Sequence, residues 1–396
     1  MSGVRAQNRV RRTERRRAVR HTAMVVAASA VVAVGTVAGV LSAVAGEGGT
    51  DDSARPEVTE PPTLRPLPAQ PSASASASVR ASVKPSASAS SSSRPSPKPS
   101  VPKRAQPAPA DTALYRHPES RVLDWVAANR GDPRRPLIES SIAARPAAVW
   151  FAEYNPGTIT GKVRSVTAGA AAAGRVPVLV PYAIPDRDCG GASKGGAPDL
   201  AAYDDWIRDF AAGLGDGPVI VILEPDSIAL ADCLSPGDRD ARYASLARAG
   251  RALHAANPNA KVYYDAGHSG WHPAEKQAAA LSRAGAASSG DGIFTNVANF
   301  HRTADEAAYA RRVLAALGGP SRLGAVIDTS RNGNGAPAPG NWCDPAGRAL
   351  GRTPTTRTGE ARIDGYLWIK LPGESDGCKG PAGTFTPSYA YELAGG

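Results

Sequence analysis

The clearest regularity in the sequence is a series of short apolar runs that begins at residue 148. Seven runs rich in apolar and β-branched residues lie at 148–154, 176–184, 218–226, 260–267, 291–300, 323–330 and 364–373. Between them, stretches such as 199–214 and 242–258 carry apolar residues at helical spacing. Apolar strands that alternate with amphipathic helices are typical of a parallel sheet covered on both faces.

Seven such units in the 285 residues from 112 to 396 predict an α/β fold, a distorted seven-stranded parallel β/α barrel of the TIM-like kind. An open, doubly wound sheet is the alternative. It is less well supported because no Gly-rich phosphate loop follows the first run, and polar residues follow nearly every run instead of gathering at one crevice.

The first 111 residues follow a different pattern. All 22 aromatic residues lie at or after Tyr115, so the chain before it cannot build a packed core. Residues 1–21, with eight Arg and one Glu, are predicted to be a basic cytoplasmic n-region. Residues 22–46 carry no charge and are predicted to be a signal peptide or a transmembrane signal anchor. Residues 47–111, rich in Pro, Ser and Ala, are predicted to be a disordered linker, and 112–396 the catalytic domain.

This organisation predicts an exported protein, either secreted or held at the membrane by an uncleaved N-terminal segment with its catalytic domain outside the cell. It also explains the charge. The whole chain has a formal charge of +10, of which residues 1–21 supply +7 and residues 47–111 supply +2, which leaves +1 for the rest. A nearly neutral globular part lacks the basic surface that nucleic-acid binding needs. We expect no nucleic-acid partner, and a monomer.

Charged side chains follow the predicted strands at the ends that meet in a parallel barrel. They are Arg187 and Asp188 after the second run, Glu224 and Asp226 after the third, Asp265 and His268 after the fourth, Asp328 and Arg331 after the sixth, and Lys370, Glu374 and Asp376 after the seventh. Crowded carboxylates raise one another's proton affinity, which can keep one of them protonated as a general acid. We predict no metal and no cofactor, because the six His are scattered and cations share the cleft.

Tryptophans suggest the ligand. Trp150, Trp271, Trp342 and Trp368 fall at or near the same predicted rim, whereas Trp125 and Trp206 lie on predicted helices and are expected in the core. Sugar rings have apolar faces and hydroxyl edges, so Trp platforms with Asp, Arg and Lys between them suit a chain of β-linked glucose.

Long motifs in this part of the chain resemble one family. The segments VPYAIPDRDCGGASKGG (180–196) and VILEPDSIAL (221–230) resemble the two signatures of glycoside hydrolase family 6, the inverting β-1,4-glucanases and cellobiohydrolases. Five further segments resemble that family in its order: YYDAGHSGW (263–271), NVANF (296–300), DTSRNGNG (328–335), GNWCDP (340–345) and LWIKLPGESDG (367–377).

The resemblance implies roles for individual residues. Asp226 matches the general acid, Asp188 the aspartate that raises the pKa of that acid, and Asp376 the residue proposed as the base, with Asp188 as the other base candidate. The implied substrate-binding residues are Tyr182, Trp150, His268, Trp271, Asn296, Asn299, Trp342, Lys370 and Glu374. The implied supporting residues are Arg187, Asp265, Asp328, Ser193 and Arg331, the last as the ion-pair partner of Asp376.

The four Cys allow three pairings, and the resemblance implies Cys189–Cys233 and Cys343–Cys378. The chain departs from the family pattern at Lys194, where a small residue is expected, and at Ala298, where a serine is frequent. The predicted function is an endo-β-1,4-glucanase that hydrolyses cellulose or a related β-glucan with inversion. The alternatives are an exo-acting cellobiohydrolase of the same family and a tethered glucan-binding protein with impaired catalysis.

Overall fold

A computed structural model describes residues 113–191 and 193–396. The predictions for 1–21, 22–46 and 47–111 lie outside the described residues. Within the described part, no helix combines the length and the apolar character needed to cross a membrane.

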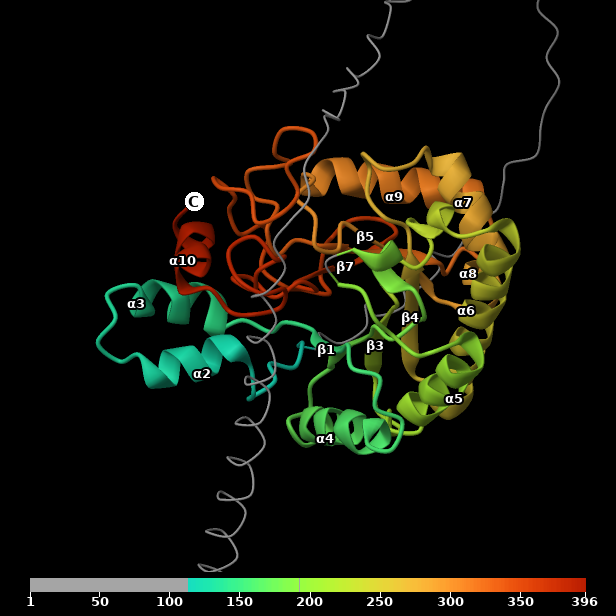
Figure 1. The fold of residues 1–396 in the computed structure, drawn as a ribbon, viewed down its shortest axis with the longest axis horizontal. Helices are drawn as coiled ribbons and strands as arrows, with labels where there is room; N and C mark the ends of the chain where they lie inside the picture. The colour runs from blue at the N-terminus through green and yellow to red at the C-terminus, as the bar shows by residue number, and fades with distance from the viewer. Residues whose placement is uncertain (1–112, 192) are drawn as a thin grey trace, which may run out of the picture. The chain divides into compact units, whose positions relative to one another are not determined.

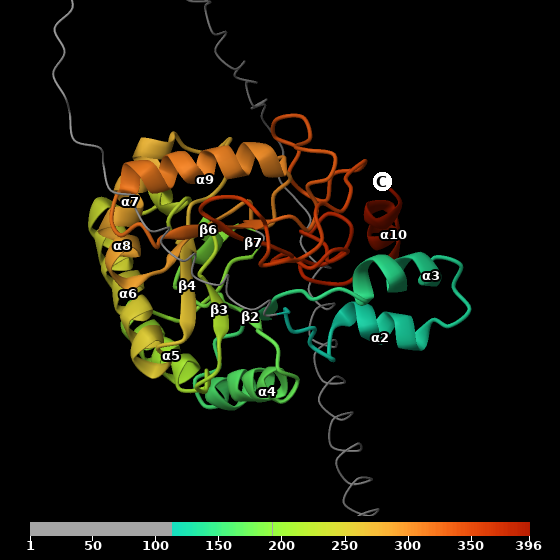
Figure 2. The same cartoon turned by 180° about the vertical axis from the view of Figure 1, so that it is seen from behind.

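The core of the fold is a sheet of seven parallel strands arranged in the order of the sequence, as the apolar runs predicted (Figures 1 and 2). The strands are β1 (Val149–Phe151), β2 (Val178–Pro181), β3 (Val219–Leu223), β4 (Ala260–Asp265), β5 (Gly292–Thr295), β6 (Gly324–Asp328) and β7 (Ile363–Leu367). Each strand is shorter than the run that predicted it, because most of the runs continue into the loop at the carboxyl end of the strand.

The barrel is not closed by a continuous ladder. Among the described residues, each strand from β1 to β6 pairs with the next strand in the sequence, but no ladder joins β7 to β1. In the part of the chain that the structure describes, a single backbone hydrogen bond joins the two edges, from the Ala148 N–H to the Trp368 carbonyl at 2.9 Å. The indole N–H of Trp150 adds a bond of 2.7 Å to the Ile369 carbonyl. The seam between β1 and β7 is therefore the irregular part of the barrel.

Helices cover the outside of the curled sheet (Figures 1 and 2). The covering helices are α4 (Ile159–Ala172), α5 (Leu200–Ala211), α6 (Pro236–Ala256), α7 (Ala274–Arg283), α8 (Ala286–Ser289) and α9 (Thr303–Leu317). The shorter helical turns are η2 (Arg187–Gly190) and η3 (Ala231–Cys233). The predicted helix at 242–258 begins earlier than expected, at Pro236, because Ser235 caps it through the Asp238 N–H and Pro236 occupies the first turn.

The strands are apolar throughout because both faces are buried. In β3, Val219, Val221 and Leu223 pack against the covering helices, whereas Ile220 and Ile222 point into the barrel interior. This two-sided burial explains why the apolar runs in the sequence are continuous instead of alternating.

A second group of helices packs beside the seam, and the apolar repeat did not predict it as a unit. It consists of α2 (Arg121–Ala128), α3 (Arg135–Ile138), the π-helical turn η1 (Glu139–Ala143) and α10 (Pro387–Gly395). Residues from both ends of the described chain meet there, with Ile138 and Ala390 packed in one apolar cluster together with Trp368. These helices belong to no repeated strand and helix unit, so the periodic pattern carries no signal for them.

Candidate active site

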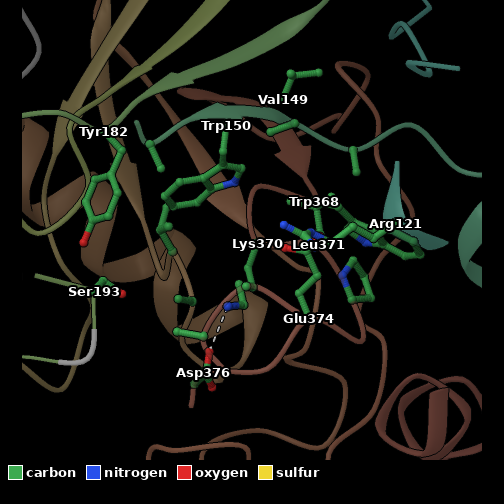
Figure 3. A pocket seen from close by; sticks show the side chains of 18 of the residues that line it. Arg121, Val149, Trp150, Tyr182, Ser193, Trp368, Lys370, Leu371, Glu374 and Asp376 are labelled. Carbon is green, nitrogen blue, oxygen red and sulfur yellow. Dashed lines mark ion pairs between the residues drawn. The ribbon is translucent and has the colours of Figure 1, made fainter. Parts of the chain in front are cut away.

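The carboxyl ends of the strands open into one cleft with a volume of about 1160 Å³ (Figure 3). Most of the residues predicted to form the site line it. They are Trp150, Tyr182, Arg187, Asp188, Ser193, Asp226, His268, Trp271, Asn299, Trp342, Lys370, Glu374 and Asp376. The departures from the family pattern, Lys194 and Ala298, also line the cleft.

Asn296, predicted to bind substrate, is placed differently. Its side chain is fully buried and makes three internal hydrogen bonds. The amide nitrogen donates to the carbonyls of Asp328 and His301, and the amide oxygen accepts from the His301 N–H. Asn296 does not line the cleft, so we correct its role from a substrate ligand to a residue that holds the loops after β5 and β6 together.

Asp226 stands directly after β3 at the floor of the cleft. Its backbone and that of Glu224 both adopt the left-handed conformation, with φ of 68° and 49°, which turns the chain sharply at the strand end. Burial, together with the negative charges of Asp265 and Asp188, raises the pKa of Asp226 from 3.8 to about 8. Asp226 is therefore protonated at neutral pH and can donate a proton.

Glu224 has no contact with the cleft, and we assigned it no role from the sequence. Its side chain is fully buried and its two oxygens accept the backbone N–H groups of Ala183 and Ile184, at 3.0 and 3.1 Å. These two residues directly follow Tyr182, so Glu224 fixes the segment that presents Tyr182 to the cleft. Burial raises the pKa of Glu224 to about 7.

Asp265 and Asp328, predicted as supporting residues, bind neighbouring loops in the same way. The buried Asp265 carboxylate accepts the N–H groups of Ile228 and Ala229 and so holds the segment that follows Asp226. The buried Asp328 carboxylate accepts the Lys370 N–H at 2.9 Å. Each of the three buried acids thus ties together the ends of adjacent strands.

The loop that carries Asp188 is shaped by unusual backbone conformations. Asp186, Asp188 and Cys189 all have positive φ, and the Cys189–Cys233 disulfide joins this loop to the chain after β3. The Asp188 carboxylate accepts the Ser193 N–H at 2.7 Å. Arg187 donates to the carbonyls of Ser193, Ala152 and Tyr182, and its guanidinium lies over the Tyr182 ring at 4.5 Å.

Asp376 lies on the opposite side of the cleft, between two cations. Its carboxylate is 2.7 Å from the guanidinium of Arg331 and 3.0 Å from the ammonium of Lys370. The ion pair with Arg331 confirms the predicted partner, and the Arg331 side chain is completely buried. Figure 3 shows the ion pair between Lys370 and Asp376 as a dashed line below Trp150.

Asp344 supports this side of the cleft, although we did not single it out in the sequence analysis. It is buried, and its carboxylate accepts the N–H groups of Asp376, Cys378 and Lys379 and the Ser375 hydroxyl. The adjacent Cys343–Cys378 disulfide closes the same loop. Both disulfides implied by the resemblance are thus present, one on each side of the cleft. The only advance signal for Asp344 was its position beside Cys343.

The aromatic side chains form two groups: some present a ring face to the cleft, and others are packed in the core. Trp342 is 57% exposed, and Trp150 meets the Tyr182 ring edge to face at 5.3 Å. Trp206 is fully buried and Trp125 packs against Phe385, as predicted. Trp368 lines the cleft, as predicted, but most of its surface is packed in the apolar cluster beside the seam, because its side chain is only 2% exposed and its indole N–H donates to the Arg352 carbonyl.

His268 and Trp271 share a loop that is anchored from behind. The His268 ring stacks on His301 at 4.2 Å. Burial and the neighbouring His301 and His272 lower the pKa of His268 to about 3, so His268 is neutral. The fully buried Glu306 of α9, which we did not single out from the sequence, accepts the Ser269 N–H at 2.8 Å and holds the loop in place.

No group of three or more His, Cys, Asp or Glu side chains among the described residues is placed to hold a metal ion. The side chains that line the cleft offer acid and base chemistry. It combines a protonated carboxyl at Asp226, carboxylates at Asp188 and Asp376, and exposed aromatic faces. This set is suited to the cleavage of a bond whose leaving oxygen needs a proton.

Comparisons with known proteins agree with this geometry. The family model described as "Glycosyl hydrolases family 6" matches residues 111–394. "Endoglucanase 1" of a Streptomyces species (strain KSM-9) is 57% identical over 72% of this chain and 78% of its own length. "Endoglucanase A" of Thermobispora bispora is 51% identical over 73% of this chain and 64% of its own. The solved structure of the endoglucanase Cel6 from Mycobacterium tuberculosis, in complex with a thio-linked cello-oligosaccharide, aligns with a TM-score of 0.67 and 42% identity, over 72% of this chain and 97% of that one.

Proposed function

Because the chain belongs to glycosyl hydrolase family 6, we propose that its cleft cleaves a β-1,4-glucan with Asp226 as the general acid. The protein is an endo-β-1,4-glucanase, a glycoside hydrolase of the cellulase type, consistent with the endoglucanases to which it is similar. Its substrate class is β-glucan. The roles of individual residues that follow are our proposal.

The observation that carries this proposal is the position of Asp226 in the cleft, buried and close to Asp188 and Asp265. A glycosidic oxygen leaves readily only when a proton is donated to it as the bond breaks. Burial and the charges of Asp265 and Asp188 raise the pKa of Asp226 to about 8, so the proton is present at neutral pH. Tyr182 lies close to Asp226 in the cleft. We assign to Tyr182 the role of contacting the sugar ring at the point of cleavage.

Inversion requires a water on the opposite face of the sugar and a carboxylate to accept its proton. Asp188 and Asp376 both line the cleft and are the two candidates for this base. Asp188 binds the Ser193 N–H, which places Ser193 beside it as a ligand for the water. Asp376 lies between Arg331 and Lys370, 2.7 Å from the first and 3.0 Å from the second.

The remaining lining residues bind the glucan chain. Trp150, Trp271 and Trp342 offer apolar faces for sugar rings, and Lys370, Glu374, His268 and Asn299 offer polar groups for hydroxyls. The neutral state of His268 suits a hydrogen bond to an uncharged hydroxyl.

The test is hydrolysis of a soluble β-1,4-glucan by the wild type and by Asp226→Ala. We expect a rapid fall in viscosity with the wild type and no comparable fall with the variant. Equal rates for the two would favour a glucan-binding protein over an enzyme. Release of cellobiose alone, without a rapid fall in viscosity, would favour an exo-acting cellobiohydrolase.

The finer points of location are also a proposal. The two disulfides are typical of an exported protein. We assign residues 22–46 to a signal peptide or membrane anchor, residues 47–111 to a linker, and residues 112–396 to a monomeric catalytic domain. Determination of the N-terminal residue of the exported protein, together with its mass in solution, tests these assignments.

A further inference from the structure

The cleft continues past the residues used above into a region rich in arginine. Arg116, Arg121 and Arg145 line this part, which we call the basic end. They come from the segment before α2, from α2 itself and from the chain after η1, outside the strand loops that carry the catalytic acids. Figure 3 shows Arg121 beside Glu374, across Trp150 from Tyr182 and Ser193. The basic end therefore lies beyond the point of cleavage along the cleft.

The positive charge of the basic end is poorly compensated. Within the described part of the chain, no carboxylate lies within ion-pair distance of Arg116 or Arg145, and the Arg116 guanidinium contacts only the Ala143 carbonyl, at 3.3 Å. Arg121 is 62% exposed and lies 3.9 Å from Glu374, a long contact for an ion pair. Arg145 is exposed.

The acids near the basic end do not cancel this charge. Glu119 lines the cleft and is exposed, and Glu374 is the partner that Arg121 already contacts. Glu153, farther along the lining, pairs with Lys162 at 3.4 Å. Three arginines therefore face two local carboxylates, although the catalytic domain as a whole is nearly neutral.

We propose that the basic end binds the carboxylate groups of an acidic β-glucan, a chain that carries uronic acid units or carboxyl-substituted glucose. A guanidinium binds a carboxylate through two parallel hydrogen bonds, so unpaired arginines along a sugar-binding cleft recognise an acidic sugar better than a neutral one. This inference rests on the proposed function, because the basic end can contact the carboxylates of a glucan only when that glucan lies in the cleft.

The experiment compares two soluble polymers, anionic carboxymethylcellulose and neutral hydroxyethylcellulose, with the full chain. The test variant is Arg116→Gln/Arg145→Gln, which leaves the contact between Arg121 and Glu374 intact. The control variant is Arg175→Gln/Arg251→Gln, which removes two exposed arginines that do not line the cleft. Net charge is the same in both variants, so a general electrostatic effect changes both equally.

We expect the test variant to raise KM for carboxymethylcellulose about five-fold, with a much smaller change for hydroxyethylcellulose and an unchanged kcat. The control variant is expected to behave as the wild type. The preference of the wild type for the anionic polymer should weaken at high salt. Arg145→Gln alone, which removes no hydrogen bond of that side chain, should show part of the effect if the double variant is unstable.

Equal KM changes on the two polymers, or the same change in the control variant, would overturn the inference. This failure differs from failure of the proposed function. If the wild type hydrolysed neither polymer, the assignment of the cleft as a glucanase site would be the one at fault.

Discussion

The carboxyl groups on the two walls of the cleft differ in whether they form ion pairs. On the wall formed by the loops after β2 and β3, Asp188 and Asp226 form no ion pair within the described residues, and Arg187 donates its hydrogen bonds to backbone carbonyls. On the wall formed by the loop after β7, Asp376 is paired with both Arg331 and Lys370.

This difference shows how one cleft can contain an acid and a base. Crowding and burial without a cation favour the protonated form, which raises the pKa of Asp226 to about 8. Asp376 instead forms ion pairs with two cations, Arg331 at 2.7 Å and Lys370 at 3.0 Å. The folded chain therefore gives chemically identical side chains two different electrostatic surroundings.

The largest expected effect is on catalysis at the wall formed by the loops after β2 and β3. Asp226→Asn should lower kcat on a soluble β-glucan by about 10²–10⁴, because proton donation to the leaving oxygen is lost. Steady-state kinetics on that polymer measures this. On an aryl cellobioside with a leaving group that needs no proton, the loss should be far smaller. A similar loss on both substrates would show that Asp226 is not the acid.

Replacing Asp by Asn should affect the free energy of unfolding differently on the two walls. Asp376→Asn leaves the fully buried Arg331 without its counter-ion, so we expect a loss of about 3–5 kcal/mol in the free energy of unfolding. Asp226→Asn should not destabilise, because a carboxyl with a raised pKa reduces stability as pH rises from its unfolded pKa toward about 8. Denaturant unfolding of both variants at pH 8 measures the difference.

A stability loss in Asp226→Asn equal to that in Asp376→Asn would contradict the contrast between the walls. The wild type supplies the matched control, since its own stability should fall between pH 5 and pH 8 by the contribution of Asp226, a contribution that is absent from Asp226→Asn.

The charge of Asp188 should set the alkaline limit of activity. The acid must be protonated, so kcat/KM should fall as pH rises through about 8. Asp188→Asn removes a negative charge that helps to raise the pKa of Asp226, and the alkaline limb should therefore move to lower pH by about one unit. The pH profile of kcat/KM tests this. An unmoved alkaline limb would show that Asp188 does not control the acid.

The smallest expected effect concerns the two disulfides. Asp344 holds the loop of Asp376 through several backbone N–H groups independently of Cys343–Cys378. The loop of Asp188 contains three residues with positive φ and depends more on Cys189–Cys233. Replacing Cys189 and Cys233 by Ser should therefore lower kcat/KM several-fold more than replacing Cys343 and Cys378. Equal effects would show that the Asp344 hydrogen bonds do not hold the loop.

Much of the fold could be predicted from the sequence, for a specific reason. Strands buried on both faces must be apolar at every position, so the β-strands appear directly as apolar runs, as β3 does with Val219–Leu223. The helices beside the seam were missed as a unit because no such repeat contains them. The start of α6 was misplaced because its first turn is polar and is set by Ser235 and Pro236.

The candidate site was predicted only where long motifs carried it. Asp226, Asp188 and Asp376 were found in this way, and the cleft contains all three. The sequence analysis missed the roles of three buried acids, Glu224, Asp344 and Glu306. A carboxylate that binds backbone N–H groups has the same local sequence signal as any polar residue near a turn. Asn296 was misjudged because its position behind the cleft depends on burial by segments distant in the sequence.

The sequence by itself therefore determined the parallel strand and helix architecture, the position of the carboxyl groups at the strand ends and the family. Burial periodicity and contiguous motifs are local properties, and local properties can be read along the chain. Only the tertiary structure decided which carboxyl is crowded and which is paired, because a pKa depends on neighbours from distant segments. Asp226 meets Asp188 and Asp265, whereas Asp376 meets Arg331, which lies 45 residues earlier in the sequence.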